Sequence, residues 1–178
     1  MVLTCTDTDN AKHQVEKNSA YFGTADNYVQ YNYRFKTGGK SGSKNNLKLT
    51  VPADGELKIA VRSASASDET RTLILTQNET EIYKDFIKDS NSEKVTIEDA
   101  EKAVYHYITV NVKKGDINIT YPVNGINFYA FEFTPASNSE TAIESVKVSV
   151  DNNAKAYNVG GRVAAKGLVI KNGKKYVK

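Results

Sequence analysis

The stretch HYITVNVKKGDINITYPVNGINFYAFEF, residues 106–133, alternates apolar and polar side chains over most of its length. Ile108, Val110 and Val112 take every second position, and a new alternation begins after Gly115. A period of two places successive side chains on opposite faces of a β-strand. Gly115 and Gly125 mark turns, so we expect three strands joined as a meander or as part of a Greek key.

The same period recurs upstream of this stretch. In Tyr28–Lys36 every second residue is apolar, which predicts a strand with one apolar face. Leu47–Val51 and Leu57–Val61 alternate on either side of the turn sequence PADG, residues 52–55, and we expect them to form a hairpin.

Shorter strands are expected at residues 71–77, 81–86 and 95–97, and residues 97–103 are compatible with a single helical turn. In all, about eight to nine strands precede residue 135, at a spacing of roughly 8–12 residues. The sequence therefore predicts an all-β protein, an antiparallel β-sandwich of jelly-roll type. We assign residues 1–135 to the sandwich, 136–142 to a linker and 143–178 to a small β-rich C-terminal tail.

Composition and charge exclude several classes of function. Residues 151–178 carry seven Lys or Arg and one Asp, whereas the other 150 residues carry 17 Lys or Arg and 20 Asp or Glu. The predicted sandwich is thus slightly acidic, which argues against nucleic-acid binding. A single cysteine, Cys5, excludes an internal disulfide framework. No apolar run approaches the roughly 20 residues of a membrane span.

The C-terminal tail carries two pieces, YNVGGRV at residues 157–163 and KGLVIKNGKK at residues 166–175. In this order they resemble the C-terminal sorting tails of proteins secreted by Bacteroidetes. The departure from the usual pattern is Val159-Gly160, where those tails have Leu followed by a variable residue. The resemblance covers residues 143–178 and implies a secreted or cell-surface protein.

A second resemblance lies in segments 49–51, 55–65, 67–73 and 124–129, which include the sequences GELKIAVRSAS and NGINFY. They are similar to a β-sandwich domain appended to secreted Bacteroidetes polysaccharide-degrading enzymes such as pectate lyases. This domain has the layout of a carbohydrate-binding module. The resemblance implies a non-catalytic module that targets a covalently linked catalytic domain to plant or host polysaccharide, with pectic glycans the first choice.

Sugar-binding sites combine an apolar platform with a few placed polar groups. Arg62 and Arg71 flank a serine-rich loop and have the fork geometry that suits a uronate carboxylate, although either could instead pair with an acidic loop residue such as Asp68. Asn127 either satisfies buried backbone or faces a ligand. Tyrosines could stack on a sugar or simply pack the sandwich; we take Tyr121 and Tyr129 as site candidates from a larger set that includes Tyr28, Tyr83, Tyr105 and Tyr107.

Neither a catalytic site nor a cofactor is predicted. A structural calcium ion is left open at Asp7, Asp9 and Asn10, or at Asp26 and Asn27, because hard oxygen ligands suit Ca²⁺. Two alternatives to sugar binding also stay open. One is a structural spacer or adhesion module, and the other is a fragment of a polysaccharide lyase.

Overall fold

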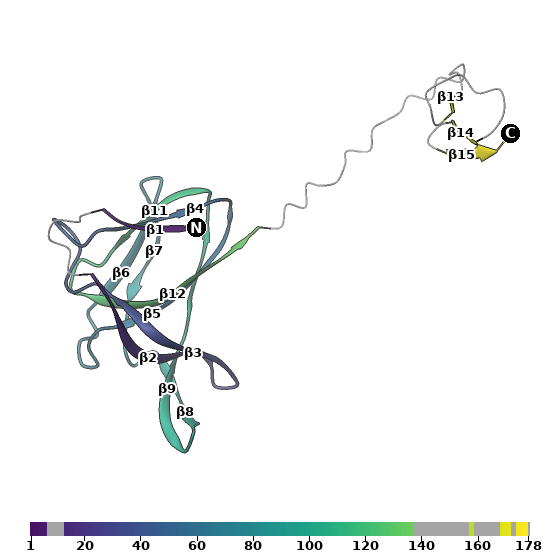
Figure 1. Ribbon diagram of the computed structural model, residues 1–178. Helices are drawn as coiled ribbons and strands as arrows, with labels where there is room; N and C mark the ends of the chain where they lie inside the picture. Colours follow the sequence, from purple (N-terminus) through teal and green to yellow (C-terminus); the bar gives the residue numbers. More distant parts are fainter. Residues whose placement is uncertain (7–12, 137–156, 159–167, 172–173, 178) are drawn as a thin grey trace. The chain divides into compact units, whose positions relative to one another are not determined.

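The computed structural model describes residues 1–6 and 13–136, together with the tail segments 157–158, 168–171 and 174–177. The chain divides into two compact units, Met1–Ser137 and Asn138–Lys178. The first unit is a two-sheet β-sandwich (Figure 1), so the predicted fold class is confirmed.

Five strands form the first sheet and seven form the second. In spatial order, the first sheet contains β1 (Val2–Cys5), β4 (Leu47–Val51), β11 (Gly115–Thr120), β6 (Thr72–Gln77) and β7 (Thr80–Phe86). The second sheet contains β10 (Ile108–Val112), β5 (Gly55–Ser63), β12 (Ile126–Pro135), β3 (Asn27–Lys36), β2 (Gln14–Thr24), β9 (Ala100–Tyr105) and β8 (Ser92–Ile97).

The strand order is that of a jelly roll. Strands β4, β11, β6 and β7 face β3, β12, β5 and β10, and the chain crosses between the sheets at seven of the eleven connections from β1 to β12. The hairpin expected from residues 47–61 is therefore wrong, because β4 and β5 lie in different sheets. The meander alternative for residues 106–133 is also wrong, since β11 lies in the first sheet and its two neighbours in the second. Alternation predicts which face of a strand is buried but not which sheet the strand joins.

The main core lies between the two sheets. It consists mostly of leucine, isoleucine and valine, and it includes Leu57, Ile59 and Val61 of β5, as their alternation predicts. A second and smaller cluster contains Ala60 of the same strand. Because successive side chains of a strand point to opposite faces, the second cluster lies on the outer face of β5.

The second cluster exists because the seven-stranded sheet curls. Only His106 and Tyr107 connect β9, at one side of this sheet, with β10, at its opposite edge. The sheet therefore bends back towards itself, and Phe22 of β2 becomes fully buried among tyrosine rings. One pairing departs from the antiparallel expectation, because β2 and β9 are parallel at Tyr21 and Phe22.

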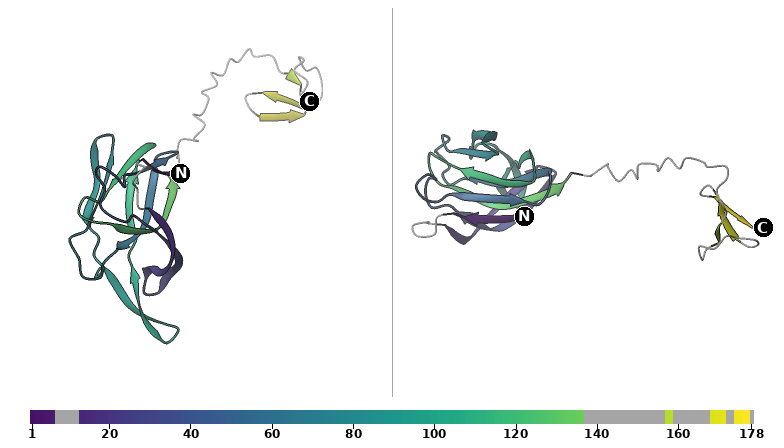
Figure 2. Two further views of the ribbon diagram at one scale, coloured as in Figure 1. Left: turned by 60° about the vertical axis from the view of Figure 1, so that its left-hand side comes forward. Right: turned by 90° about the horizontal axis from the view of Figure 1, so that it is seen from above.

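The β8–β9 hairpin extends from one end of the sandwich (Figure 1 and Figure 2). The helical turn suggested for residues 97–103 is wrong, because this segment is the tip of that hairpin. Glu98 and Asp99 both have positive φ, 50° and 61°, as a two-residue hairpin turn of type I′ requires.

The tail unit contains a small antiparallel sheet. Its strands are β13 (Tyr157–Asn158), β14 (Leu168–Lys171) and β15 (Lys174–Val177), in that order. Most of the predicted linker, residues 136–142, lies outside the described residues.

Candidate ligand-binding groove

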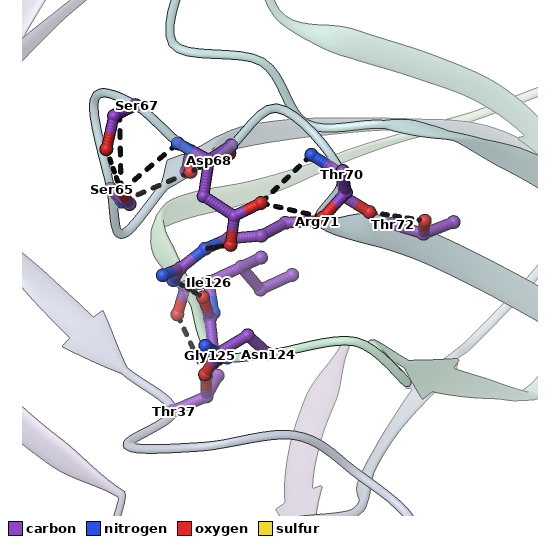
Figure 3. Close-up of polar contacts among 11 residues, drawn as sticks. Thr37, Ser65, Ser67, Asp68, Thr70, Arg71, Thr72, Asn124, Gly125 and Ile126 are labelled. Atoms are coloured by element: carbon purple, nitrogen blue, oxygen red, sulfur yellow. Dashed lines mark hydrogen bonds and ion pairs between the residues drawn. The ribbon is translucent and has the colours of Figure 1, made fainter.

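Arg71 is a structural cross-link within the sandwich (Figure 3). It is only 9% exposed. Its Nε donates to Asp68 Oδ2 at 3.0 Å and its Nη1 donates to the carbonyl oxygen of Gly125. Hydrogen bonds from Thr70, together with the one from Arg71, hold the pKa of Asp68 below its ordinary value. The guanidinium thus joins the loop after β5 to the turn before β12, which is the pairing that the sequence offered as the alternative to ligand binding.

Arg62 lies on the outer face of β5 and is also engaged. Its Nη2 pairs with Asp89 Oδ1 at 2.9 Å, and its guanidinium lies 4.6 Å from the centroid of the Tyr105 ring. Asn127 is the cross-strand neighbour of Arg62 and is almost completely buried. Within the described part of the chain, Arg62 Nε and Asn127 Oδ1 are buried atoms without a hydrogen-bond partner.

Tyr121 is fully buried in the main core. Its hydroxyl donates to the carbonyl oxygen of Asn45 and lies 3.2 Å from His13 Nε2. Its ring has no face left for a sugar, so in this structure Tyr121 positions the loop that precedes β4.

Tyr129 has a different environment, because it sits at a β-bulge. The pairing of β12 with β5 shifts between Phe128 and Ala130, which leaves Tyr129 as the extra residue. Its hydroxyl donates to Asn18 Oδ1 at 2.6 Å. Beside it, β12 pairs with β3 at two positions only, Asn127 and Phe128, and the two strands then separate.

A groove of about 220 Å³ opens where β3 and β12 separate. Its lining is mostly apolar, and it includes two side chains that are largely exposed, Tyr33 at 60% and Val15 at 73%. The lining residues are Leu3, Val15, Tyr33, Arg34, Phe35, Phe128, Tyr129, Ala130 and Phe131. We call this the β3–β12 groove.

Charged groups border the β3–β12 groove. Arg34 Nε donates to Glu16 Oε1 at 2.7 Å, and Lys36 lies 3.8 Å from the same carboxylate. The hydrogen bond from Arg34 is the main reason that the pKa of Glu16 is lowered. Lys17 is exposed and stands directly opposite Tyr33 in the β2–β3 pairing, so its ammonium lies on the same face of the sheet as the Tyr33 ring.

Of the five predicted site residues, only Tyr129 lines this groove. Arg62 and Asn127 are neighbours of each other, whereas Arg71 and Tyr121 serve the sandwich itself. Sequence reasoning missed Tyr33 because the alternation of β3 assigned it to the apolar, buried face. The available signal was an aromatic run with polar residues on both sides, YNYRF at residues 31–35, close to a polar Gly/Ser loop.

The structure describes only some of the residues that the sequence suggested as calcium ligands. Asp7, Asp9 and Asn10 lie outside the described residues. Among the residues that are described, no three His, Cys, Asp or Glu side chains are grouped so that they could hold a metal ion. The same part of the chain has no helix of the length and apolar character that crossing a bilayer takes.

Comparison with known proteins adds no relative, because no family model matches the chain and a search of curated proteins also finds no match.

Proposed function

We propose that the sandwich is a non-catalytic carbohydrate-binding module that binds polysaccharide in the β3–β12 groove. The observation that carries the proposal is Tyr33, a residue that is 60% exposed and lines an apolar groove. Exposing a large ring costs free energy unless something covers it, and a sugar presents a C–H face of matching shape. Tyr129 and Arg34 supply polar atoms at the border of the groove for the ligand's hydroxyls.

The polysaccharide is of plant or host origin, and the module brings a covalently linked glycan-degrading domain to it. The resemblance of the tail to sorting tails supports a secreted or cell-surface location. Pectic glycans are the first class to test. Arg62 and Arg71 are occupied by Asp89 and Asp68, so the cation offered to a uronate carboxylate is Lys17 beside Tyr33.

Affinity gel electrophoresis tests the proposal. The purified chain is run through gels that contain polygalacturonate, methyl-esterified pectin, xylan, mannan or β-glucan. We expect retardation in at least one gel, and Tyr33→Ala should weaken binding by about tenfold or more, as loss of an aromatic anchor does.

Tyr28→Ala is the matched control, because Tyr28 is an exposed tyrosine of the same strand that does not line the groove. Mobility that is unchanged in every gel, for a protein shown to be folded, would instead favour the spacer or adhesion module. Formation of unsaturated uronides from polygalacturonate would identify a lyase fragment.

A further inference from the structure

A second cleft lies at the end of β7 and the segment that follows it, and it shares no lining residue with the β3–β12 groove. Its outer basin has a volume of about 350 Å³ and is lined by Asp85, Phe86, Lys88, Ser90 and Asn91. A recess of about 40 Å³ continues inwards between the same segment and residues of β9 and β10. We call the two together the β7 cleft. The basin is within the size range of small-ligand sites.

Two residues, Ile87 and Asp89, attach the segment that forms this cleft to the sandwich. Ile87 is buried, and its backbone N–H donates to the carbonyl oxygen of Arg71 at 2.7 Å. Asp89 accepts hydrogen bonds from Arg62 and from the Tyr105 hydroxyl, both at 2.9 Å. Because Ile87 and Asp89 are fixed against the sandwich, Lys88 between them and Phe86 before them are turned outwards.

The outward residues are Phe86 and Lys88. Phe86 is 51% exposed, and the Lys88 ammonium lies 5.8 Å from the centroid of its ring. In the described part of the chain Lys88 has no carboxylate within ion-pair distance, and the Asn91 side chain makes no hydrogen bond. Asp85 uses Oδ1 to accept from the backbone N–H of Phe86, which leaves Oδ2 for a ligand.

The charges of the basin balance, because Asp85 and Lys88 are its two ionised residues. An exposed ring, a carboxylate, an ammonium and an amide around a basin of zero net charge suit a neutral ring that bears several hydroxyls. The carboxylate accepts from hydroxyl groups, whereas the ammonium and the amide donate to them. The ring of Phe86 offers a face for the apolar side of such a ligand.

We propose that the β7 cleft is a second, independent binding site for a neutral sugar ring, so that the module holds a glycan chain at two places. This inference rests on the proposed function for its ligand class, but not on the β3–β12 groove. When both sites of the module bind the same glycan chain, binding at one site favours binding at the other. The apparent affinity for long chains is therefore higher than that of either site alone. The hydrogen bonds of Ile87 and Asp89 hold the backbone on both sides of Lys88, which lowers the entropic cost of binding.

Chemical-shift mapping with the full chain separates the two sites. Short neutral oligosaccharides of xylose, mannose and glucose are titrated into ¹⁵N-labelled protein, and the amides of residues 85–91 are followed together with those of residues 15–17 and 33–35. We expect saturable shifts at residues 85–91. Phe86→Ala should weaken the affinity of this set by about tenfold or more and leave the set at residues 15–17 and 33–35 unchanged.

Lys84→Gln is the matched control, because Lys84 is an exposed lysine of β7 that does not line the basin. Lys88→Gln should weaken the affinity of residues 85–91, whereas Lys84→Gln should not. Shifts confined to residues 15–17 and 33–35 would overturn the second site and leave the proposed function intact. Shifts confined to residues 85–91 would support the second site, and the gels with polygalacturonate and pectin then decide the groove. A folded protein without shifts at residues 85–91 would overturn the second site.

Discussion

The two cores of the sandwich bury apolar surface in different ways. The main core joins the faces of two sheets and is built mostly of leucine, isoleucine and valine. The second core joins two parts of one curled sheet, and a single phenylalanine, Phe22, is surrounded there by tyrosines. Tyr105 is buried, whereas Tyr31, Tyr107 and Tyr129 are only partly buried, and their hydroxyls pair with neighbouring polar side chains. The curled sheet thus buries amphipathic tyrosine rings, whereas the two facing sheets bury aliphatic side chains between them.

The largest effect is expected at the centre of the second core. Phe22 is fully buried, and its ring centroid lies 5.1 to 5.8 Å from those of four tyrosines. Phe22→Ala should lower the free energy of unfolding by about 3–5 kcal/mol, measured by urea denaturation. Leu75→Ala provides the comparison in the main core, with an expected loss of about 2–5 kcal/mol. A loss below about 1 kcal/mol for Phe22→Ala would mean that the second core contributes little to folding.

High pH should destabilise the protein through its tyrosines. Burial is the first cause that raises the pKa of Tyr31, Tyr105 and Tyr129 above the ordinary value of 10.0. The folded state therefore keeps its protons longer than the unfolded state, and stability that is fully present below pH 10 should be lost as the pH rises above it. The urea midpoint measured between pH 8 and pH 11 checks this direction. A midpoint that does not change over this range would contradict the tyrosine account.

A smaller effect is expected when one hydroxyl is removed from the second core. The Tyr31 hydroxyl donates to Glu132 Oε1 at 2.7 Å and lies 3.1 Å from the Tyr107 hydroxyl. Tyr31→Phe keeps the ring and should cost about 0.5–1.5 kcal/mol in urea denaturation, since the site is partly open to solvent. Tyr28→Phe, at an exposed tyrosine of the same strand, is the control and should change stability very little. Equal losses in the two variants would show that the hydroxyl pairs contribute nothing.

The smallest effect on stability is expected outside both cores. Tyr33 is largely exposed, so Tyr33→Ala should change the free energy of unfolding by no more than about 0.5 kcal/mol. This small change makes it a clean variant for binding studies. A loss of more than about 2 kcal/mol would place Tyr33 in the packing of the sandwich and weaken its role in the groove.

The main core could be predicted from the sequence, but the second core could not. Leu57, Ile59 and Val61 follow a strict period of two, and a buried face follows from that period directly. Phe22 lies in a segment with weak patterning, because the bulge between Lys17 and Ala20 interrupts its alternation. Its burial depends on the curl of the sheet, which is a long-range property. The crossings between sheets were missed for the same reason.

The candidate site was predictable only in part. Tyr129 reaches the β3–β12 groove because a bulge leaves it unpaired in β12, and the sequence gives no sign of that bulge. Arg71 was recognised as an arginine that could pair with Asp68, and this is the contact that it makes. Residue type thus indicated which interactions were available, whereas the choice between ligand and protein partners depended on packing.

Titration calorimetry of the purified chain and of Tyr33→Ala, against soluble oligosaccharides of each glycan class, tests the central claim most directly. We expect saturable binding to one class, a negative heat-capacity change from covered apolar surface, and an affinity about tenfold or more weaker for Tyr33→Ala. Binding of equal strength by both proteins, or no binding by the folded chain to any class, would contradict the assignment of the β3–β12 groove as a sugar-binding site.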